Sequence, residues 1–463
     1  MPCRKLAQEH GETARSCRNI QPTVAGTEQQ TADDLLFVGD VHLGRRPVGL
    51  DEVLAEFGVE RRDLSPAAAL ANLVDEALAR PPRAVIFAGD LVDQDEDRFE
   101  AYSILEREVR RLREAHIPVL AVAGNHDGIV LPQLIERVEG VQLIGAGGQW
   151  ERVELAGPGQ PVDLLGWSFP GRHFKTCPLD HESFEAAHAS LRPEAAALGV
   201  VHGDLGASAS SYAPIPHARL DGTTLAAWFL GHVHKPGELT AERPIGYLGS
   251  LTGLHANETG PRGPWRVRPE PSGVTAQQVH LAPVRWEAPV VALEEGDVLD
   301  IETLHRRIEA SVLEQLSADS TLFDPRLKLI VARVELTGRL AQRDAVRELV
   351  AGHHAHDMVF RLEHAPVIVQ SLRDLTRKAI DLEARAGEAT AIGHVARCLL
   401  ELRAGGGGEQ LGEARRTIER FASADWNIDE EDHPLPSPEQ LLERAAWSVL
   451  DVLLEQREEA GRL

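Results

Sequence analysis

The chain is predicted to have an α/β fold in which parallel strands carry polar residues to one edge of a sheet. Short apolar runs of strand length alternate with segments of helical periodicity from residue 35 to about residue 230. Five of these runs are followed at once by Gly, Asp, Asn or His. Buried parallel strands have this continuous apolar character, and ligands bind at their carboxyl ends. The pattern therefore predicts one shared site built from several strand ends.

The first two strands establish this pattern. An apolar run at residues 35–38 leads to Asp40, and a second at residues 84–88 leads to Asp90. Between them lies a Ser-Pro pair at residues 65–66, which is typical of a helix start because Ser caps a helix and Pro suits its first turn. We therefore expect a helix between these two strands.

Three more strands are expected further along the chain. A helix over about residues 99–115 has its apolar residues on one face and leads to a strand at residues 119–123. Strands at residues 198–201 and 228–230 come later. Each of the three is followed within two residues by Asn or His, so each is expected to deliver a polar side chain to the same edge.

The rest of the chain divides by changes in composition. Residues 1–33 are polar and without periodicity, so we expect a disordered extension. The domain that carries the site is expected over residues 34–283. Residues 284–365 combine strands and helices, which predicts a small α/β capping module, and residues 366–463 are predicted to form helices. The last helix, expected over residues 438–459, is apolar on a broad face.

Composition excludes several classes of protein. The net charge of −24 argues against a surface that binds nucleic acid all over, although a local basic path is compatible with it. The four cysteines are far apart, which argues against a structural zinc site or a disulfide framework. No run has the length of a transmembrane helix, and the N-terminus lacks the apolar run of a secretory signal. We therefore expect a soluble cytoplasmic protein that does not bind membranes.

Five blocks of the sequence contain residues of the types that bind metal ions. They read Asp40-Val41-His42, Gly89-Asp90, Gly124-Asn125-His126-Asp127, His202-Gly203 and Gly231-His232-Val233-His234. Carboxylate, amide and imidazole ligands suit manganese, iron or zinc, and a carboxylate bridges two ions where an imidazole cannot. The predicted ligands of a two-metal site are Asp40, His42, Asp90, Asn125, His202, His232 and His234, with Asp90 as the bridge. Such a site is typical of enzymes that hydrolyse phosphate esters.

Two further residues of the third block are predicted to take part in catalysis. His126 directly follows the candidate ligand Asn125, so it is expected to lie beside the metals without binding them. In that position it would stabilise the transition state or protonate the leaving alkoxide. Asp127 is predicted to fix the tautomer of His126.

These motifs resemble those of the calcineurin-like metallophosphoesterases over about residues 35–281. Within that superfamily the chain is most similar to the SbcD/Mre-type DNA repair exonucleases, particularly the bacterial YhaO-like branch. The similarity rests on residues 40–44, 89–93, 231–236, 249–250 and 257–263. It implies a four-layer β-sandwich flanked by helices, two manganese ions and cleavage of DNA phosphodiesters. Archaeal and eukaryotic relatives have a second working His where this chain has Asp93, so Asp93 is not assigned a catalytic role.

A segment beyond the metal motifs has the composition of a nucleic-acid contact. Several arginines and a Trp lie between residues 255 and 268 with only one acid, Glu258. Arginines track a phosphate backbone, and an aromatic ring stacks on an unpaired base. The alternative is that they are ordinary solvated arginines around a hairpin. The predicted DNA contacts are Arg45, Arg46, Arg262, Trp265 and Arg266.

A partner subunit is also predicted. The chain has no Gly-Lys pair and therefore no P-loop, so any ATP-driven step needs another protein. In the resembled family that protein is a long coiled-coil ATPase of the SbcC type, bound by helices after the second module. The helix over residues 438–459 is the candidate contact. The alternative is that this helix packs on its own domain. The resemblance also implies a possible homodimer.

Two other functions remain open. The metal motifs alone would serve a metallo-phosphodiesterase or phosphatase that acts on small nucleotides or phosphoproteins. The C-terminal extension and residues 257–263 favour the nuclease, and Asp127 replaces the Glu expected in a protein phosphatase. The third possibility, a scaffold without catalysis, is disfavoured because all seven ligand positions keep suitable residues.

Overall fold

The computed structural model describes residues 33–48, 58–207, 209–294, 300–341, 343–352, 358–362, 365–404, 412–413, 416–417 and 437–462. The chain divides into two compact units. Unit 1 comprises Met1–Gly44, Leu70–Gly249 and Pro264–Gln278, and unit 2 comprises Arg45–Ala69, Ser250–Gly263 and Val279–Leu463. The predicted disordered extension covers residues 1–33. Of these, residues 1–32 lie outside the described residues. Residues 45–69 and 250–263 group with unit 2, although both fall inside the linear domain predicted over residues 34–283.

Unit 1 contains two sheets. The first has the order β11-β10-β1-β2-β3-β4, with β1 (Leu35–Val38), β2 (Val85–Ala88), β3 (Val119–Val122), β4 (Val141–Leu143), β10 (Trp265–Glu270) and β11 (Gly273–Gln278). The strands β1 to β4 are parallel, and β10 and β11 join them as an antiparallel edge. Every residue of β1, β2 and β3 is buried, as their unbroken apolar sequences predict for strands covered on both faces.

The second sheet of unit 1 has the order β5-β6-β7-β8-β9. Its strands are β5 (Trp150–Leu155), β6 (Val162–Trp167), β7 (Ala196–His202), β8 (Ala227–Gly231) and β9 (Ile245–Tyr247). The strands β6 to β9 are parallel, and β5 is antiparallel to β6. In each sheet, several parallel strands therefore have their carboxyl ends at the same edge.

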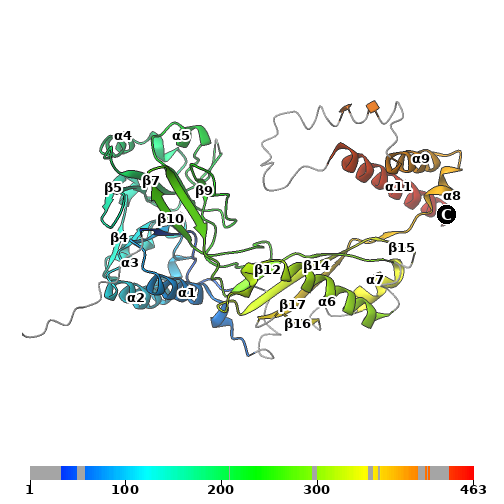
Figure 1. Cartoon of the computed structure of the whole chain (residues 1–463), viewed down its shortest axis with the longest axis horizontal. Coiled ribbons are helices and arrows are strands. Elements are labelled where there is room, and N and C mark those ends of the chain that lie inside the picture. Colours follow the sequence, from blue (N-terminus) through cyan, green and yellow to red (C-terminus); the bar gives the residue numbers. More distant parts are fainter. Residues whose placement is uncertain are drawn as a thin grey trace, which may run out of the picture. The chain divides into compact units, whose positions relative to one another are not determined.

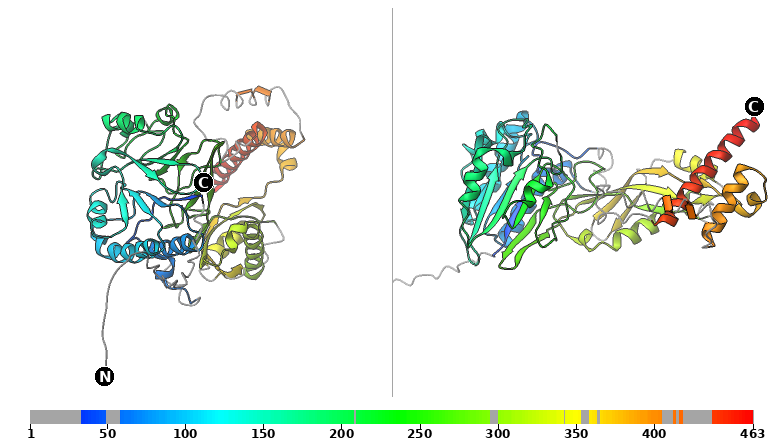
Figure 2. Two further views of the ribbon diagram at one scale, coloured as in Figure 1. Left: turned by 60° about the vertical axis from the view of Figure 1, so that its left-hand side comes forward. Right: turned by 90° about the horizontal axis from the view of Figure 1, so that it is seen from above.

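Helices cover the outer faces of the two sheets. They are α1 (Pro66–Ala79), α2 (Arg98–Glu114), α3 (Val130–Ile135), α4 (Glu182–Ala189) and α5 (His217–Asp221). Helix α1 starts as predicted, with the Ser65 hydroxyl accepting the backbone N–H of Ala68. Phe184 of α4 and Leu220 of α5 pack on the outer face of the second sheet, and α1 and α2 lie along the first (Figure 1, Figure 2). The predicted four-layer arrangement is confirmed.

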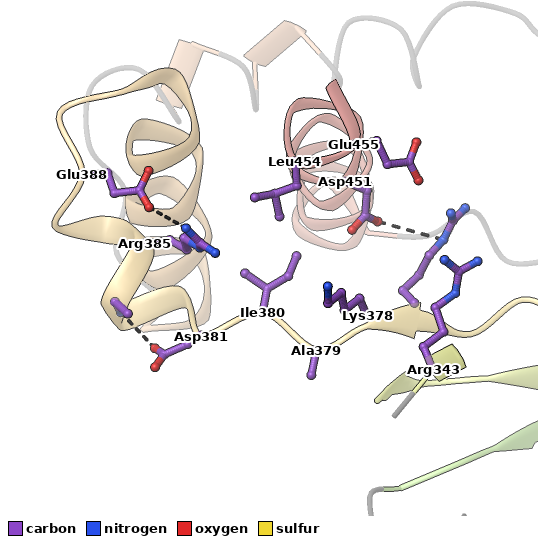
Figure 3. Close-up of a pocket in the computed structure, with 12 residues that line it drawn as sticks. Arg343, Lys378, Ala379, Ile380, Asp381, Arg385, Glu388, Asp451, Leu454 and Glu455 are labelled. Carbon is purple, nitrogen blue, oxygen red and sulfur yellow. Dashed lines mark hydrogen bonds and ion pairs between the residues drawn. The ribbon is translucent and has the colours of Figure 1, made fainter. Parts of the chain in front are cut away.

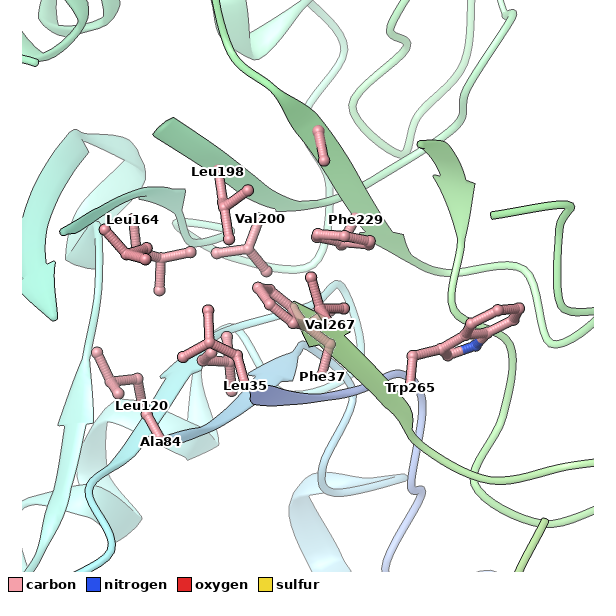
Figure 4. Close-up of a cluster of buried hydrophobic side chains, with 14 of the residues drawn as sticks. Leu35, Phe37, Ala84, Leu120, Leu164, Leu198, Val200, Phe229, Trp265 and Val267 are labelled. Carbon is pink, nitrogen blue, oxygen red and sulfur yellow. The ribbon is translucent and has the colours of Figure 1, made fainter. Parts of the chain in front are cut away.

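The main core of unit 1 lies between the two sheets (Figure 4). It contains Leu35 and Phe37 of β1, Leu198 of β7 and Phe229 of β8. The Phe37 and Phe229 rings meet across the interface with centroids 4.4 Å apart. This packing fixes the position of one sheet on the other, because close-packed side chains leave little room for sliding. The carboxyl ends of the strands in the two sheets therefore keep the same distance from each other.

Unit 2 contains a separate α/β module. Its sheet has the order β12-β14-β17-β16, with β13 also paired to β14; the elements are β12 (Val284–Glu287), β13 (Val290–Ala292), α6 (Ile301–Ser317), β14 (Leu329–Thr337), α7 (Arg343–Gly352), β16 (Val359–Leu362) and β17 (Ala365–Asp374). Leu304 and Ile308 of α6 and Val346 of α7 pack against this sheet in a core of their own.

Short 3-10 helices occur in both units. They are η3 (Asp95–Asp97), η4 (Ala146–Gly148) and η5 (Pro178–Asp180) in unit 1, and η2 (Arg61–Leu64) and η7 (Ser320–Phe323) in unit 2.

The C-terminal helices form the remaining part of unit 2. They are α8 (Leu382–Ala386), α9 (Ala391–Arg403) and α11 (Pro438–Arg462), next to a short ladder of β15 (Arg339–Leu340) and β18 (Arg377–Lys378). Leu450 of α11 packs on Leu399 of α9, and Arg339 donates to both carboxylate oxygens of Asp451 at 3.0 and 2.9 Å. A cavity of about 260 Å³ lies beside these contacts, lined by side chains such as Ile380 and Leu454 (Figure 3). Of the helices in the described ranges, none is long and apolar enough to cross a membrane.

Candidate metal centre

The seven predicted ligands come together in unit 1. The residues after β1, β2 and β3 meet those at the ends of β7 and β8 of the second sheet. Among the described residues, three groups have ligand atoms within 4.8 Å of one another: Asp40 with His42 and His234; His42 with Asp90 and His126; and Asp90 with His202 and His232. Asp90 and His42 each belong to two groups. This arrangement fits two adjacent ions with Asp90 between them.

The backbone at the strand ends adopts uncommon conformations. His42, Asp90 and His232 have φ values of 53°, 49° and 110°, which residues other than glycine rarely adopt. Glycines allow the two sheets to approach closely at this edge. A Cβ on Gly89 would lie 2.5 Å from His202 Nδ1, and one on Gly231 would lie 2.2 Å from the Ala88 carbonyl oxygen. Such strain clusters at functional sites, where it holds side chains in place.

His42 presents its second ring nitrogen toward His234. Its Nδ1 lies 2.9 Å from an oxygen of Asp93, and its Nε2 lies 2.9 Å from Nε2 of His234. A carboxylate only accepts hydrogen bonds, so the proton of neutral His42 is on Nδ1 and Nε2 carries a lone pair. Asp93 is thus part of the site, a role that the sequence did not reveal because only the fold brings it to His42.

His202 and His232 converge on Asn125 in a similar way. His202 Nδ1 lies 3.0 Å from the Ala88 carbonyl oxygen, which fixes its proton there and turns the Nε2 lone pair inward. His202 Nε2 and His232 Nδ1 lie 2.9 and 3.0 Å from the same Asn125 Oδ1. Lone pairs from several nitrogens and oxygens therefore face a common space. This donor set fits divalent cations, which would lie among these atoms and relieve the repulsion between them.

Electrostatics at the site favour cations as well. Burial alone would raise the pKa of Asp90, but the neighbouring His202, His42 and His126 outweigh it and hold that pKa well below its usual range. Burial opposes a charge on His202, yet the Asp90 carboxylate raises the pKa of His202 to about 9. The buried carboxylates thus favour a positive charge at this position, which a bound metal cation would supply.

The structure corrects the predicted role of Asp127. The side chain is fully buried, and it accepts backbone N–H groups of Gly124 at 2.8 Å and of Leu91 at 2.7 Å. Burial and the nearby Asp90 raise the pKa of Asp127 to about 7. His126 does not rely on Asp127 for its orientation. Its Nδ1 lies 2.8 Å from the backbone carbonyl oxygen of Asp93, so Asp127 ties together the loops after β2 and β3 instead.

His126 itself lies where the sequence predicts it. Its backbone N–H donates to Asp90 at 3.0 Å, while its side chain remains 41 % exposed. Beside it is a cavity of about 460 Å³, whose lining consists of Asp93, Gln94, Glu96, Asn125, His126, Arg172, His173 and Tyr212. The imidazole of His126 therefore faces both the candidate metal cluster and a space that can hold a substrate.

Three of the predicted DNA contacts are corrected by the structure. Arg262 and Trp265 are only 2 % and 6 % exposed, and the Trp265 indole N–H donates to the Leu248 carbonyl oxygen at 2.9 Å within the main core. The Arg266 side chain is 10 % exposed, and its guanidinium donates to Asp34 at 2.7 Å. These side chains are held within the fold by their own partners and present little surface to nucleic acid. Of the other two predicted contacts, Arg45 is half-buried and Arg46 is exposed, and both belong to unit 2.

Residues 34–236 match the family model of the calcineurin-like phosphoesterases. The matched region makes up less than half of the chain, and it is similar to that family. Its members are metal-dependent hydrolases with a dinuclear metal site, in agreement with the clustered ligands of unit 1. The matched region contains the strands β1 to β8 and ends just after the last predicted ligand, His234.

Individual relatives are similar to parts of the chain of different lengths. The "Uncharacterized metallophosphoesterase YhaO" of Bacillus subtilis is 28 % identical over 271 residues, which cover 57 % of this chain and 64 % of that protein. Proteins named "DNA double-strand break repair protein Mre11" from Aeropyrum pernix and Sulfurisphaera tokodaii are 41 % and 32 % identical over 93 residues, or 20 % of this chain. The chain thus spans less than two thirds of YhaO, and 20 % and 22 % of these two Mre11 proteins.

Part of the chain also aligns with a solved structure. It is the crystal structure of a dimetal phosphatase from Danio rerio, which is 13 % identical and has a TM-score of 0.34. The similarity covers 54 % of this chain and 99 % of that chain.

Proposed function

We propose that this protein is a nuclease that hydrolyses DNA phosphodiesters with two manganese ions, acting as an exonuclease or endonuclease in DNA repair. The observation that carries the hydrolysis is the convergence of histidine and carboxylate ligands next to His126 and an open cavity. The choice of DNA as substrate is supported by the similarity to proteins named as Mre11 repair proteins. The choice of manganese follows the predicted family resemblance and the mixture of oxygen and nitrogen ligands.

The residues of the chain suggest how the reaction proceeds. When bound, two divalent cations supply Lewis-acid activation of the phosphoryl group and of water. The residues that would hold those ions are Asp40, His42, Asp90, Asn125, His202, His232 and His234. Asp93 orients His42 through a carboxylate oxygen and His126 through its backbone carbonyl oxygen. The Asp93 carbonyl accepts from Nδ1–H, so Nε2 of His126 is the nitrogen left for the substrate. When the imidazole is protonated, Nε2–H can donate its proton to the leaving alkoxide, as a general acid does.

The cavity beside His126 has the chemistry of a nucleotide site. Arg172 is exposed at its wall and pairs with Asp95 at 2.6 Å, so its guanidinium can exchange that partner for a phosphate. His173 and Tyr212 line the same cavity with ring centroids 5.8 Å apart, and aromatic rings of this kind stack on unpaired bases. These groups support an end or an unpaired nucleotide of DNA as the part of the substrate that enters the site.

Degradation of DNA in the presence of manganese is the first test. Purified protein with manganese should shorten linear duplex DNA, and chelation should abolish the reaction. Assays with cyclic nucleotides, phosphopeptides and bis(p-nitrophenyl) phosphate separate the alternatives. Cleavage of cyclic nucleotides or phosphopeptides without cleavage of any DNA would replace the nuclease by the small-substrate phosphodiesterase or phosphatase. No hydrolysis of any ester would favour the scaffold.

We also propose that α11 contacts an SbcC-like coiled-coil ATPase. One side of α11 packs on its own unit through Leu450 and Asp451, as the alternative prediction for this helix requires. Another side leaves Val449 and Val452 48 % and 51 % exposed. Exposed valines on an otherwise charged helix suit a groove or a helix of a partner. The helix thus has one side for its own fold and one side for a second protein.

A double substitution on α11 tests this contact. Val449→Asp with Val452→Asp should abolish co-purification with an SbcC-like ATPase from the same genome, because it places two charges in an apolar interface. Nuclease activity without the partner should not change. The matched control is Val290→Asp, which alters an equally exposed valine on β13. Retention of the ATPase by the double variant would show that α11 does not form the contact.

A further inference from the structure

His232 has an oxygen partner on each of its ring nitrogens. Nδ1 lies 3.0 Å from Asn125 Oδ1, and Nε2 lies 3.0 Å from Oδ1 of Asp204. Asp204 is not part of any predicted motif. It lies two residues after His202, in the loop that follows β7, and its side chain is 26 % exposed. Solvent can reach this carboxylate, so Asp204 is not a fully buried charge that must pair with His232 to be tolerated.

The second oxygen of Asp204 is held by the same loop. The Ser210 hydroxyl donates to Asp204 Oδ2, and the Tyr212 backbone N–H donates to the Ser210 hydroxyl oxygen at 3.0 Å. The Tyr212 ring then lies against the His232 ring, with centroids 5.2 Å apart. The contacts thus close a ring from His232 through Asp204, Ser210 and Tyr212 back to His232.

The chemistry of Asp204 decides which nitrogen of His232 faces the metal cluster. A carboxylate is only an acceptor, so it keeps the proton of neutral His232 on Nε2 and leaves the Nδ1 lone pair directed at Asn125. Without this partner the two tautomers and two ring orientations compete. The backbone of His232, at a φ of 110°, does not choose between the tautomers. The contact with Asp204 supplies that choice.

We propose that Asp204 is a positioning residue that sets the tautomer and ring orientation of His232 for binding of the second metal ion. The role rests on the proposed function only in requiring a metal at this site. Asp204 is also connected to the substrate cavity, because Ser210 links it to Tyr212, which lines that cavity. Asp204 does for His232 what Asp93 does for His42 and the Ala88 carbonyl does for His202.

Metal binding without substrate tests this role. Titration calorimetry should show two manganese ions bound to the wild type and a loss of about 10- to 100-fold in affinity for one of them in Asp204→Ala, the usual effect of removing such a partner. The electron paramagnetic resonance signal of the coupled manganese pair should give way to that of a single ion at limiting metal. Asp204→Asn should recover part of the affinity, since its amide oxygen still accepts from Nε2.

Two controls separate positioning from folding of the loop. Ser210→Ala removes one support of Asp204 but leaves the contact between Asp204 and His232, so it should lose less affinity than Asp204→Ala. Glu194→Ala alters an exposed acid of the same unit and should have no effect. Equal binding of both ions by Asp204→Ala and the wild type would overturn the proposal. If the wild type binds two ions and cleaves no DNA, the proposed substrate fails while the role of Asp204 is judged by the same titration.

Discussion

Replacing His126 by alanine is expected to lower the turnover of manganese-loaded protein by about 10²- to 10⁴-fold, the usual contribution of a general acid or base. The loss should appear in kcat, with both metal ions retained. The physical reason is that His126 has an exposed side chain at the cavity wall and contacts Asp90 only through its backbone N–H. The backbone contact survives the substitution. The measurements are hydrolysis of linear DNA and of bis(p-nitrophenyl) phosphate, together with calorimetric titration of manganese.

The control for this prediction is His217→Ala, which removes an exposed histidine at the start of α5. It should leave both turnover and metal binding unchanged. A His126→Ala variant with normal kcat would remove the proposed acid from the mechanism. A variant that loses a metal ion together with its activity would instead identify His126 as a ligand. This alternative arises because His126 belongs to one of the three ligand groups.

Trp265→Ala is expected to lower the free energy of unfolding of the protein by about 3 to 5 kcal/mol, the range for truncation of a buried Trp or Phe. Trp265 belongs to the core between the two sheets, and its indole N–H donates to the Leu248 carbonyl oxygen. The substitution opens a cavity and leaves that buried carbonyl without its donor. Urea denaturation followed by circular dichroism measures the loss.

The same variant distinguishes the structural role of Trp265 from the DNA contact predicted from sequence. Phe99→Ala is the matched control, because Phe99 is 71 % exposed and its truncation should change stability little. At a temperature where Trp265→Ala is still folded, its affinity for single-stranded DNA should equal that of the wild type. Normal stability together with weakened DNA binding would restore the original prediction.

The strand ends and the metal ligands were open to prediction because each depends on a short stretch of chain. An unbroken apolar run such as residues 119–122 has few alternatives to a buried strand, and the polar residue that follows it must emerge at the strand's end. The antiparallel strands β10 and β11 were harder to foresee. The strand β10 contains charged residues such as Arg266, and it joins the sheet because β1 and β11 offer it partners on both sides.

The arginines show why surface predictions from composition fail. Arginines near Trp265 have the pattern of a nucleic-acid contact when the sequence is read alone. In the folded chain, carboxylates distant in sequence neutralise one of them, as Asp34 and Glu76 do for Arg266. A buried, paired guanidinium and an exposed one have the same local sequence, because the difference lies in partners that only the fold supplies.

The sequence by itself determined which residues are able to bind metal and at which strand ends they lie, because ligand type and apolar periodicity are local properties. Only the tertiary structure decided how those ligands are oriented. Asp93, Asp204 and the Ala88 carbonyl each reach a histidine from another segment of the chain, and Asp127 turns away from the histidine next to it. Hydrogen-bond partners depend on distances of about 3 Å between atoms, and the packing of two sheets is what sets those distances.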